Sequence, residues 1–146
     1  MRCRTDDTLR YVQFLARRFD KQDVKAVTLI ILFDLDIGPS NEGFEYLRKA
    51  IEMNLAESNL AMTKELYSAV SKNYDGLGIW APVEQAIRRA IQAAWNGRDE
   101  ETWDLFFPPH RGKKAKCPSN KEFIARIACI IELWQSCKEA DYERVE

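Results

Sequence analysis

The segment from Val83 to Trp95 constrains the fold of this 146-residue chain more than any other. Its apolar side chains recur three and four residues apart, a spacing that places them on one face of a helix. They are Val83, Ala86, Ile87, Ala90, Ile91, Ala94 and Trp95. Pro82 suits the helix start, where its missing N–H needs no partner, and Asn96–Gly97 suits the end. A chain with this segment needs other helices against which to bury the apolar face.

The opposite face of the same segment is polar. It carries long side chains that donate or accept hydrogen bonds, namely Glu84, Gln85, Arg88, Arg89 and Gln92. Because a second predicted helix precedes it, the pair is typical of a helix-turn-helix whose second helix enters the major groove of DNA. Periodicity alone equally fits an amphipathic helix that is simply half-buried.

Start and stop signals divide the rest of the chain into further helices. Residues of the types that cap helix starts are Thr5, Asn59, Asp99 and Ser119. Ser119 and Glu122 also have the spacing of a capping box, in which each side chain accepts a hydrogen bond from the other residue's backbone N–H. Residues 24–35 are rich in β-branched side chains and fit a strand or a buried helix. The sequence predicts a single all-α domain of six to seven helices that contains a helix-turn-helix.

The same periodicity predicts which side chains face the core. In the first helix, expected over residues 5–19, they are Leu9, Val12, Ala16 and Phe19. In the helix before the turn they are Leu66, Tyr67, Val70 and Tyr74. Cys129 lies on the apolar stripe of the last helix, which indicates a small core residue.

Composition and motifs exclude several classes of protein. A hydrophobic content of 46% with 31% charged residues is typical of a globular protein. The longest apolar run, Val27 to Phe33, is too short to span a membrane, and the polar start Met1–Arg4 lacks the apolar core of a signal peptide. We therefore expect a cytoplasmic protein with no membrane partner.

The residues that carry catalytic or metal chemistry are scattered. The cysteines are Cys3, Cys117, Cys129 and Cys137. They have no C-x-x-C spacing, and His110 is the only histidine, so we expect no metal site. Asp34 and Asp36 are two residues apart, and such residues do not face each other on a helix. We expect no enzyme, no cofactor and no small-molecule substrate.

A basic loop precedes the last helix. The net charge of the chain is −1 and gives no general attraction to nucleic acid, so DNA binding would need a local cationic surface. Residues 110–116 form such a cluster, with Lys113, Lys114 and Lys116. The alternative is a loop that is merely kept in solvent by its charges.

Several segments in register resemble one protein family. They are residues 43–51, residues 63–67, the segment 83–95, residues 114–116 and residues 118–125. From about residue 27 to residue 134 the chain resembles the C-terminal DNA-binding effector domain of the stage-zero sporulation master response regulator of endospore-forming bacteria. The resemblance implies an all-helical domain in which a helix over 67–74 supports a recognition helix over 82–96. It also implies that residues 24–35 form a helix.

The resemblance assigns the candidate site. It implies base reading by Glu84, Gln85 and Arg88, and phosphate binding by Arg89, Lys113, Lys114, Lys116 and Ser119, with double-stranded DNA as partner. The family has arginines where this chain has Pro82 and Gln85. Since arginine holds guanine and glutamine prefers adenine, we expect an altered base preference.

Two departures from the family leave an alternative open. We expect an N-terminal helix over 1–22 in place of the family's receiver domain, the effector-like domain over 23–138 and a fraying acidic tail over 139–146. The turn over 76–81 is longer by about two residues, which places Ile79 and Trp80 in a loop. The alternative is a degenerate relative that works by protein contacts through Ile79–Trp80 or the first helix, as a homodimer or paired with a related regulator.

Overall fold

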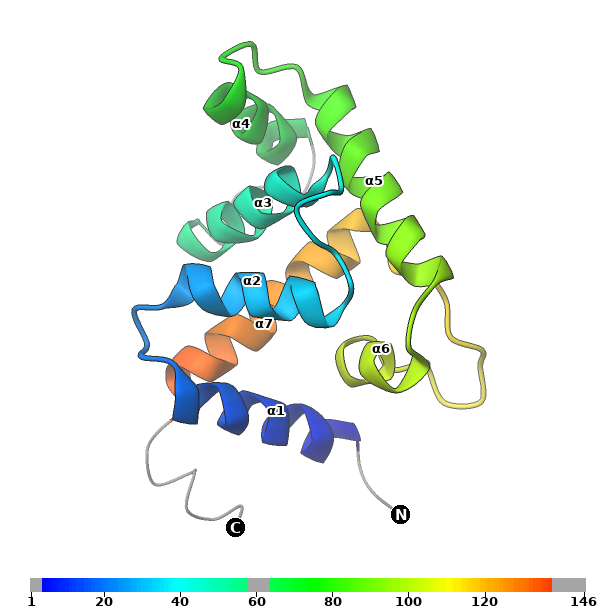
Figure 1. Ribbon diagram of the computed structural model, residues 1–146. Helices are drawn as coiled ribbons and strands as arrows, with labels where there is room; N and C mark the ends of the chain where they lie inside the picture. Colours follow the sequence, from blue (N-terminus) through cyan, green and yellow to red (C-terminus); the bar gives the residue numbers. More distant parts are fainter. Residues whose placement is uncertain (1–3, 58–63, 138–146) are drawn as a thin grey trace.

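The protein is all-helical over the residues that the structure describes, 4–57 and 64–137, which hold seven helices and no strand (Figure 1). In this computed structural model the helices are α1 (Arg4–Arg18), α2 (Val24–Asp34), α3 (Phe44–Ala56), α4 (Lys64–Tyr74), α5 (Trp80–Asn96), α6 (Glu100–Phe106) and α7 (Asn120–Ser136). The predicted all-α single domain is confirmed, and α2 settles residues 24–35 as a helix. Within these ranges no helix is long and apolar enough to cross a membrane.

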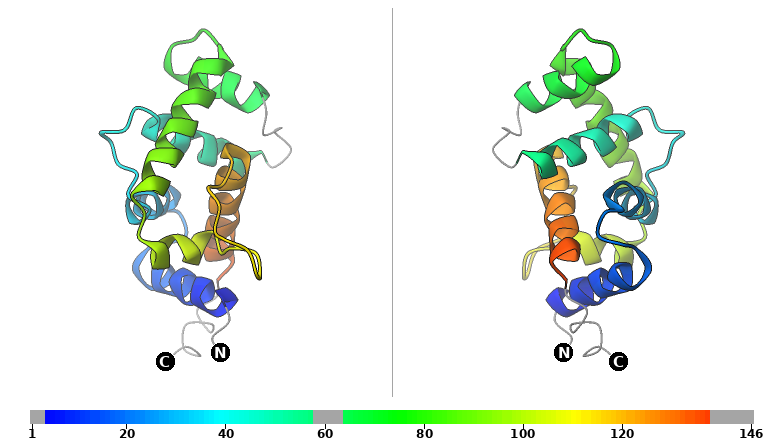
Figure 2. Two further views of the ribbon diagram at one scale, coloured as in Figure 1. Left: turned by 90° about the vertical axis from the view of Figure 1, so that its right-hand side faces the viewer. Right: turned by 90° about the vertical axis from the view of Figure 1, so that its left-hand side faces the viewer.

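Helix α7 is the axis of the fold. It contacts α1, α2, α3 and α5. Helix α4 lies at one end of the molecule and α1 at the other, and α5 runs from the α4 end down to α6 (Figures 1 and 2). The apolar stripe of α7 is buried, as predicted from the spacing of Phe123, Ile127 and Trp134. Burial of this stripe holds the N-terminus of α7 beside α5. These two helices line the candidate site described below.

Helix α6 joins the end of α5 to the start of α7. Trp103 is 1% exposed, and its ring lies 5.6 Å from that of Trp95 on α5 and 6.1 Å from that of Phe123 on α7. The predicted cap is confirmed, because the carboxylate of Asp99 accepts a hydrogen bond from Thr102 N at 3.1 Å. The contacts of the Trp103 ring with Trp95 and Phe123 fix the separation of α5 and α7.

Helices α3 and α5 approach closely at Gly43. A Cβ atom at this position would lie 2.3 Å from the carbonyl oxygen of Ala86, a distance that real Cβ contacts do not reach. The backbone angle φ of Gly43 is −82°, so the glycine is required by the close approach and not by its conformation. Helix α5 is thereby held against the N-terminus of α3 at Ala86.

Helix α1 differs from its prediction at its start and at one predicted core residue. It begins at Arg4, so Thr5 does not precede it, and Leu9 is 42% exposed whereas Leu15 is fully buried. The reason is its packing on α6 and α7, where Thr8 Oγ1 donates to Leu105 O at 3.0 Å and the Tyr11 ring contacts Phe106 edge-on. Of the predicted core residues, Val12 is fully buried and Ala16 and Phe19 pack against the core, so only Leu9 is wrong.

Three further expectations are corrected. Tyr74 is 43% exposed and its hydroxyl donates to Glu45 O at 3.0 Å, because the phenol ends in a polar group. Cys129 is exposed, since α7 has neighbours on the other sides. Trp80 is the first residue of α5 and not part of a loop. The predicted cap Asn59 and the acidic tail 139–146 lie outside the described residues.

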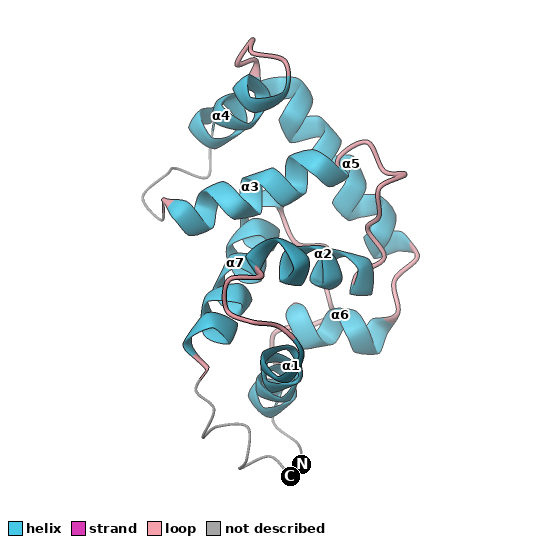
Figure 3. Cartoon of the chain, turned by 60° about the vertical axis from the view of Figure 1, so that its left-hand side comes forward, coloured by secondary structure: helices cyan, strands magenta, loops and turns pink. Residues whose placement is uncertain are grey.

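Helices α4 and α5 form the predicted pair. They pack together and are joined by the short turn over 75–79, visible as the pink loop beside α4 in Figure 3. Gly76 and Gly78 have φ angles of 77° and 75°, values that favour glycine. This arrangement is consistent with a helix-turn-helix in which α5 is the recognition helix.

Candidate nucleic-acid interface

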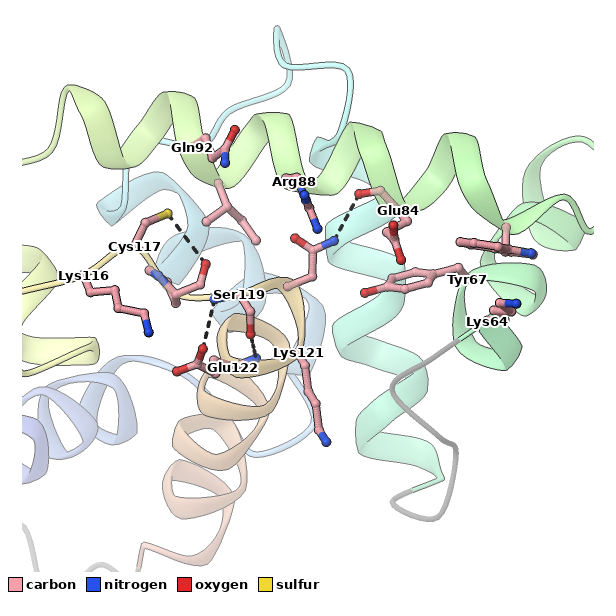
Figure 4. A pocket seen from close by; sticks show the side chains of 14 residues that line it. Lys64, Tyr67, Glu84, Arg88, Gln92, Lys116, Cys117, Ser119, Lys121 and Glu122 are labelled. Atoms are coloured by element: carbon pink, nitrogen blue, oxygen red, sulfur yellow. Dashed lines mark hydrogen bonds between the residues drawn. The ribbon is translucent and has the colours of Figure 1, made fainter.

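A groove of about 610 Å³ lies between α5 and the N-terminus of α7, with the start of α4 at one end (Figure 4). We call it the α5–α7 groove. Its α5 wall carries Trp80, Glu84, Arg88 and Gln92, and its opposite wall carries Lys116, Ser119 and Lys121. Lys64 and Tyr67 of α4 close one end. The groove therefore joins three segments that are far apart in the sequence.

The exposed side of α5 is divided into two ridges. Trp80, Glu84 and Arg88 recur every four residues, so they point in nearly one direction and face the groove. Gln85 and Arg89 are exposed on the neighbouring ridge and do not line it. The predicted base-reading set is thus split between the groove wall and the outer surface of the same helix.

The N-terminus of α7 is held by the capping box that the sequence predicted. Ser119 Oγ accepts from Glu122 N at 3.1 Å, and Glu122 Oε1 accepts from Ser119 N at 3.2 Å. The hydrogen bond from Ser119 N, followed by the interaction with the Ser119 side chain, holds the pKa of Glu122 below its usual range. Ser119 is exposed and is held in a fixed position on the groove wall.

Asn120 ties the two walls of the groove together. Its Nδ2 donates to the main-chain oxygen of Glu84 at 3.0 Å, across 36 positions of the chain. Beneath it, burial raises the pKa of Tyr67, so this phenol stays neutral at ordinary pH. The walls are therefore held by a hydrogen bond and by packing rather than by charge.

The groove is lined by four cations and by two carboxylates, Glu84 and Glu122. Lys64, Arg88, Lys116 and Lys121 are exposed, and none forms an ion pair within residues 4–57 and 64–137. The ammonium of Lys64 lies 4.9 Å from the ring centre of Trp80. Such a surface attracts an anionic ligand, because its cations outnumber its carboxylates.

The basic loop continues this surface. A second hollow of about 660 Å³ is bounded by Lys113, Lys114 and Lys116, and it shares Lys116 and Cys117 with the groove. Lys113 N donates to His110 O at 2.9 Å in a turn where Gly112 has a φ of 75°. In Figure 2 this loop lies alongside α7. The structure thus brings Lys113, Lys114, Lys116 and Ser119 together with Glu84 and Arg88 on one continuous surface.

Sequence reasoning missed part of the groove. Lys64, Trp80, Asn120 and Lys121 were not among the predicted site residues, although all line it. The four-residue spacing of Trp80, Glu84 and Arg88 was the available signal for the first wall. No local pattern could have placed Lys64 beside them, because it comes from another helix.

A comparison with protein families matches residues 28–131, well over half of the chain. The matching family model is described as the sporulation initiation factor Spo0A C terminal. The match runs from α2 into α7 and so includes the turn, α5 and the basic loop, while α1 precedes it. It confirms the resemblance seen in the sequence.

Proposed function

Because the chain belongs to the family of the sporulation initiation factor Spo0A C-terminal domain, we propose that its α5–α7 groove and basic loop bind double-stranded DNA with an altered base preference. This family consists of DNA-binding transcription-factor domains and not of enzymes. One observation carries the proposal. Arg88 and Lys116 face one groove from opposite walls, exposed and without an ion pair in the described part of the chain. A duplex needs this combination of a side chain that can reach base edges and cations beside it for phosphates.

The base-reading residues are Glu84, Gln85 and Arg88. In the major groove an arginine holds guanine through two hydrogen bonds, a glutamine holds adenine and a carboxylate accepts from the amino group of cytosine. Gln85 on the outer ridge therefore favours adenine where an arginine would favour guanine. Pro82 has no hydrogen-bonding side chain and reads no base through one.

The phosphate-binding residues are Arg89, Lys113, Lys114, Lys116 and Ser119. All five are exposed. Arg89 lies on the outer ridge beside Gln85, and the other four lie on the basic loop and at the start of α7. Contacts of this kind position a protein on DNA without reading its sequence. They also make binding weaken as salt is added, because each neutralised phosphate releases a counterion.

The test is a selection of preferred duplexes from a random pool at low salt. We expect Arg88→Ala to broaden the range of selected sequences and Lys114→Ala to weaken binding to all duplexes alike. Lys21→Ala removes a lysine outside the groove and should change neither the selected sequences nor the affinity. Failure of the unaltered protein to bind any duplex at low salt would reject the proposal.

A second candidate function rests on the turn between α4 and α5. Leu77 is 69% and Ile79 is 53% exposed there, and exposed apolar side chains can contact a protein partner. In this function the chain is an interaction module that forms a homodimer or pairs with a related regulator. Measurement of its mass in solution without DNA, before and after Leu77→Ser, separates the two functions.

A further inference from the structure

The first turn of α5 is almost free of hydrogen-bonding side chains. Ile79 precedes the helix and Trp80, Ala81, Pro82 and Val83 begin it. Among these side chains the indole N–H of Trp80 is the single donor and there is no acceptor. In helix-turn-helix proteins the N-terminal residues of the recognition helix are the ones that meet base edges. An apolar surface therefore occupies the position from which bases are read.

Trp80 is the member of this turn that faces the groove. It lies four residues before Glu84 on the same ridge, and it lines the groove with Glu84 and Arg88. Its side chain is half-buried, so one part packs on the core and another reaches solvent. Ile79, although more exposed, does not line the groove.

Lys64 holds the indole in this position. Its ammonium lies 4.9 Å from the ring centre, within the range of a cation–π contact. The pair places the Lys64 ammonium beside the apolar indole ring of Trp80. In a DNA duplex, phosphates likewise lie beside the base edges, so the ammonium can contact a phosphate while the ring contacts a base.

The major groove of DNA presents one apolar group, the C5-methyl of thymine. A large apolar side chain on the reading ridge can therefore distinguish thymine from the other bases by burying that methyl group. We propose that Trp80 is a specificity-determining residue that contacts a thymine methyl next to the bases facing Glu84. This inference rests on the proposed DNA binding and adds a base preference that no hydrogen-bonding residue of α5 supplies.

The test removes the methyl group and nothing else. A duplex selected from the random pool is prepared with each thymine replaced in turn by deoxyuridine, and binding of the unaltered protein is measured. We expect one or two of these duplexes to bind about fourfold more weakly, which corresponds to one buried methyl group. With Trp80→Ala, and in part with Trp80→Phe, the thymine and deoxyuridine duplexes should bind alike. Ile79→Ala is the matched control and should keep the difference.

The outcomes separate this inference from the proposed function. If the protein binds the selected duplex but no deoxyuridine weakens binding, the inference fails and DNA binding stands. If the difference persists in Trp80→Ala, another residue contacts the methyl group and the inference also fails. Thermal unfolding followed by circular dichroism checks that each variant is folded. Should Trp80→Ala not fold, Trp80→Phe and the deoxyuridine series on the unaltered protein still decide the question.

Discussion

Arg48 on α3 and Arg88 on α5 are arginines on two helices that pack together, and their surroundings give them opposite properties. Arg48 is paired with Glu45 at 2.7 Å and with Glu52, and its side chain is 13% exposed. Arg88 is exposed and has no ion pair in the described ranges. The comparison explains how a chain with a net charge of −1 carries a cationic groove: some of its acidic side chains neutralise cations elsewhere.

The pairing of Arg48 also affects the acidity of Glu45. Its hydrogen bond to Glu45 holds the pKa of that carboxyl below the usual range. Tyr74 on α4 completes the cluster by donating to Glu45 O at 3.0 Å. Arg48 therefore links α3 to the end of α4 through Glu45, whereas the guanidinium of Arg88 is available to a ligand.

The largest expected effect comes from Gly43, which sets the distance between the helices that carry the two arginines. Gly43→Ala forces a Cβ atom against Ala86 O and should lower the free energy of unfolding by about 3 kcal/mol. Gly38→Ala is the matched control, because no atom lies within 4 Å of its Cβ position. Urea unfolding measures both. Equal stability of the two variants would show that α3 and α5 are not in close contact here.

The comparison itself predicts the next effect. Arg88→Ala removes the proposed base contact, worth about 1–3 kcal/mol, and should weaken binding to the preferred duplex about fivefold to 150-fold. Arg48→Ala should leave binding within about twofold, because its charge is already used within the protein. Fluorescence anisotropy with one labelled duplex measures both variants. The same loss for both would contradict the distinction.

A smaller effect is expected in the basic loop. Lys114→Ala should weaken binding to every duplex by a similar factor and lower the slope of log K against log salt by about 1. Titrations at several salt concentrations measure this slope. An unchanged slope would remove Lys114 from the phosphate-binding residues and leave the groove as the site.

The smallest effect concerns the stability of the Arg48 cluster. Glu45→Gln keeps the shape of the side chain but removes its charge, and should cost about 0.5 kcal/mol at pH 7 and low salt. Because the pKa of Glu45 is lowered in the folded state, its contribution is present above the ordinary glutamate pKa and is lost as pH falls through the folded value. Urea unfolding at pH 7 and pH 3 tests this, and the difference between the proteins should be smaller at pH 3.

The sequence predicted most of the fold for reasons that are local. The stripe of α5 and the capping box of Ser119 depend only on spacing, and both are confirmed. Leu9 and Cys129 were wrong because periodicity finds an apolar face without telling which sides the neighbours cover. The roles of the site residues and the division at residues 22 and 138 stay predictions. Lys64 was missed because its place in the groove depends on three separate segments.

The hydrogen bond from Asn120 to Glu84 has a consequence for retargeting this domain to other operators. Its acceptor is the main-chain oxygen, so the bond does not depend on which side chain stands at position 84. Under the proposed function, a substitution at position 84 would therefore change the bases recognised while the N-terminus of α7 stays docked on α5. The base preference could then be altered by substitution without loss of the contact between α5 and α7.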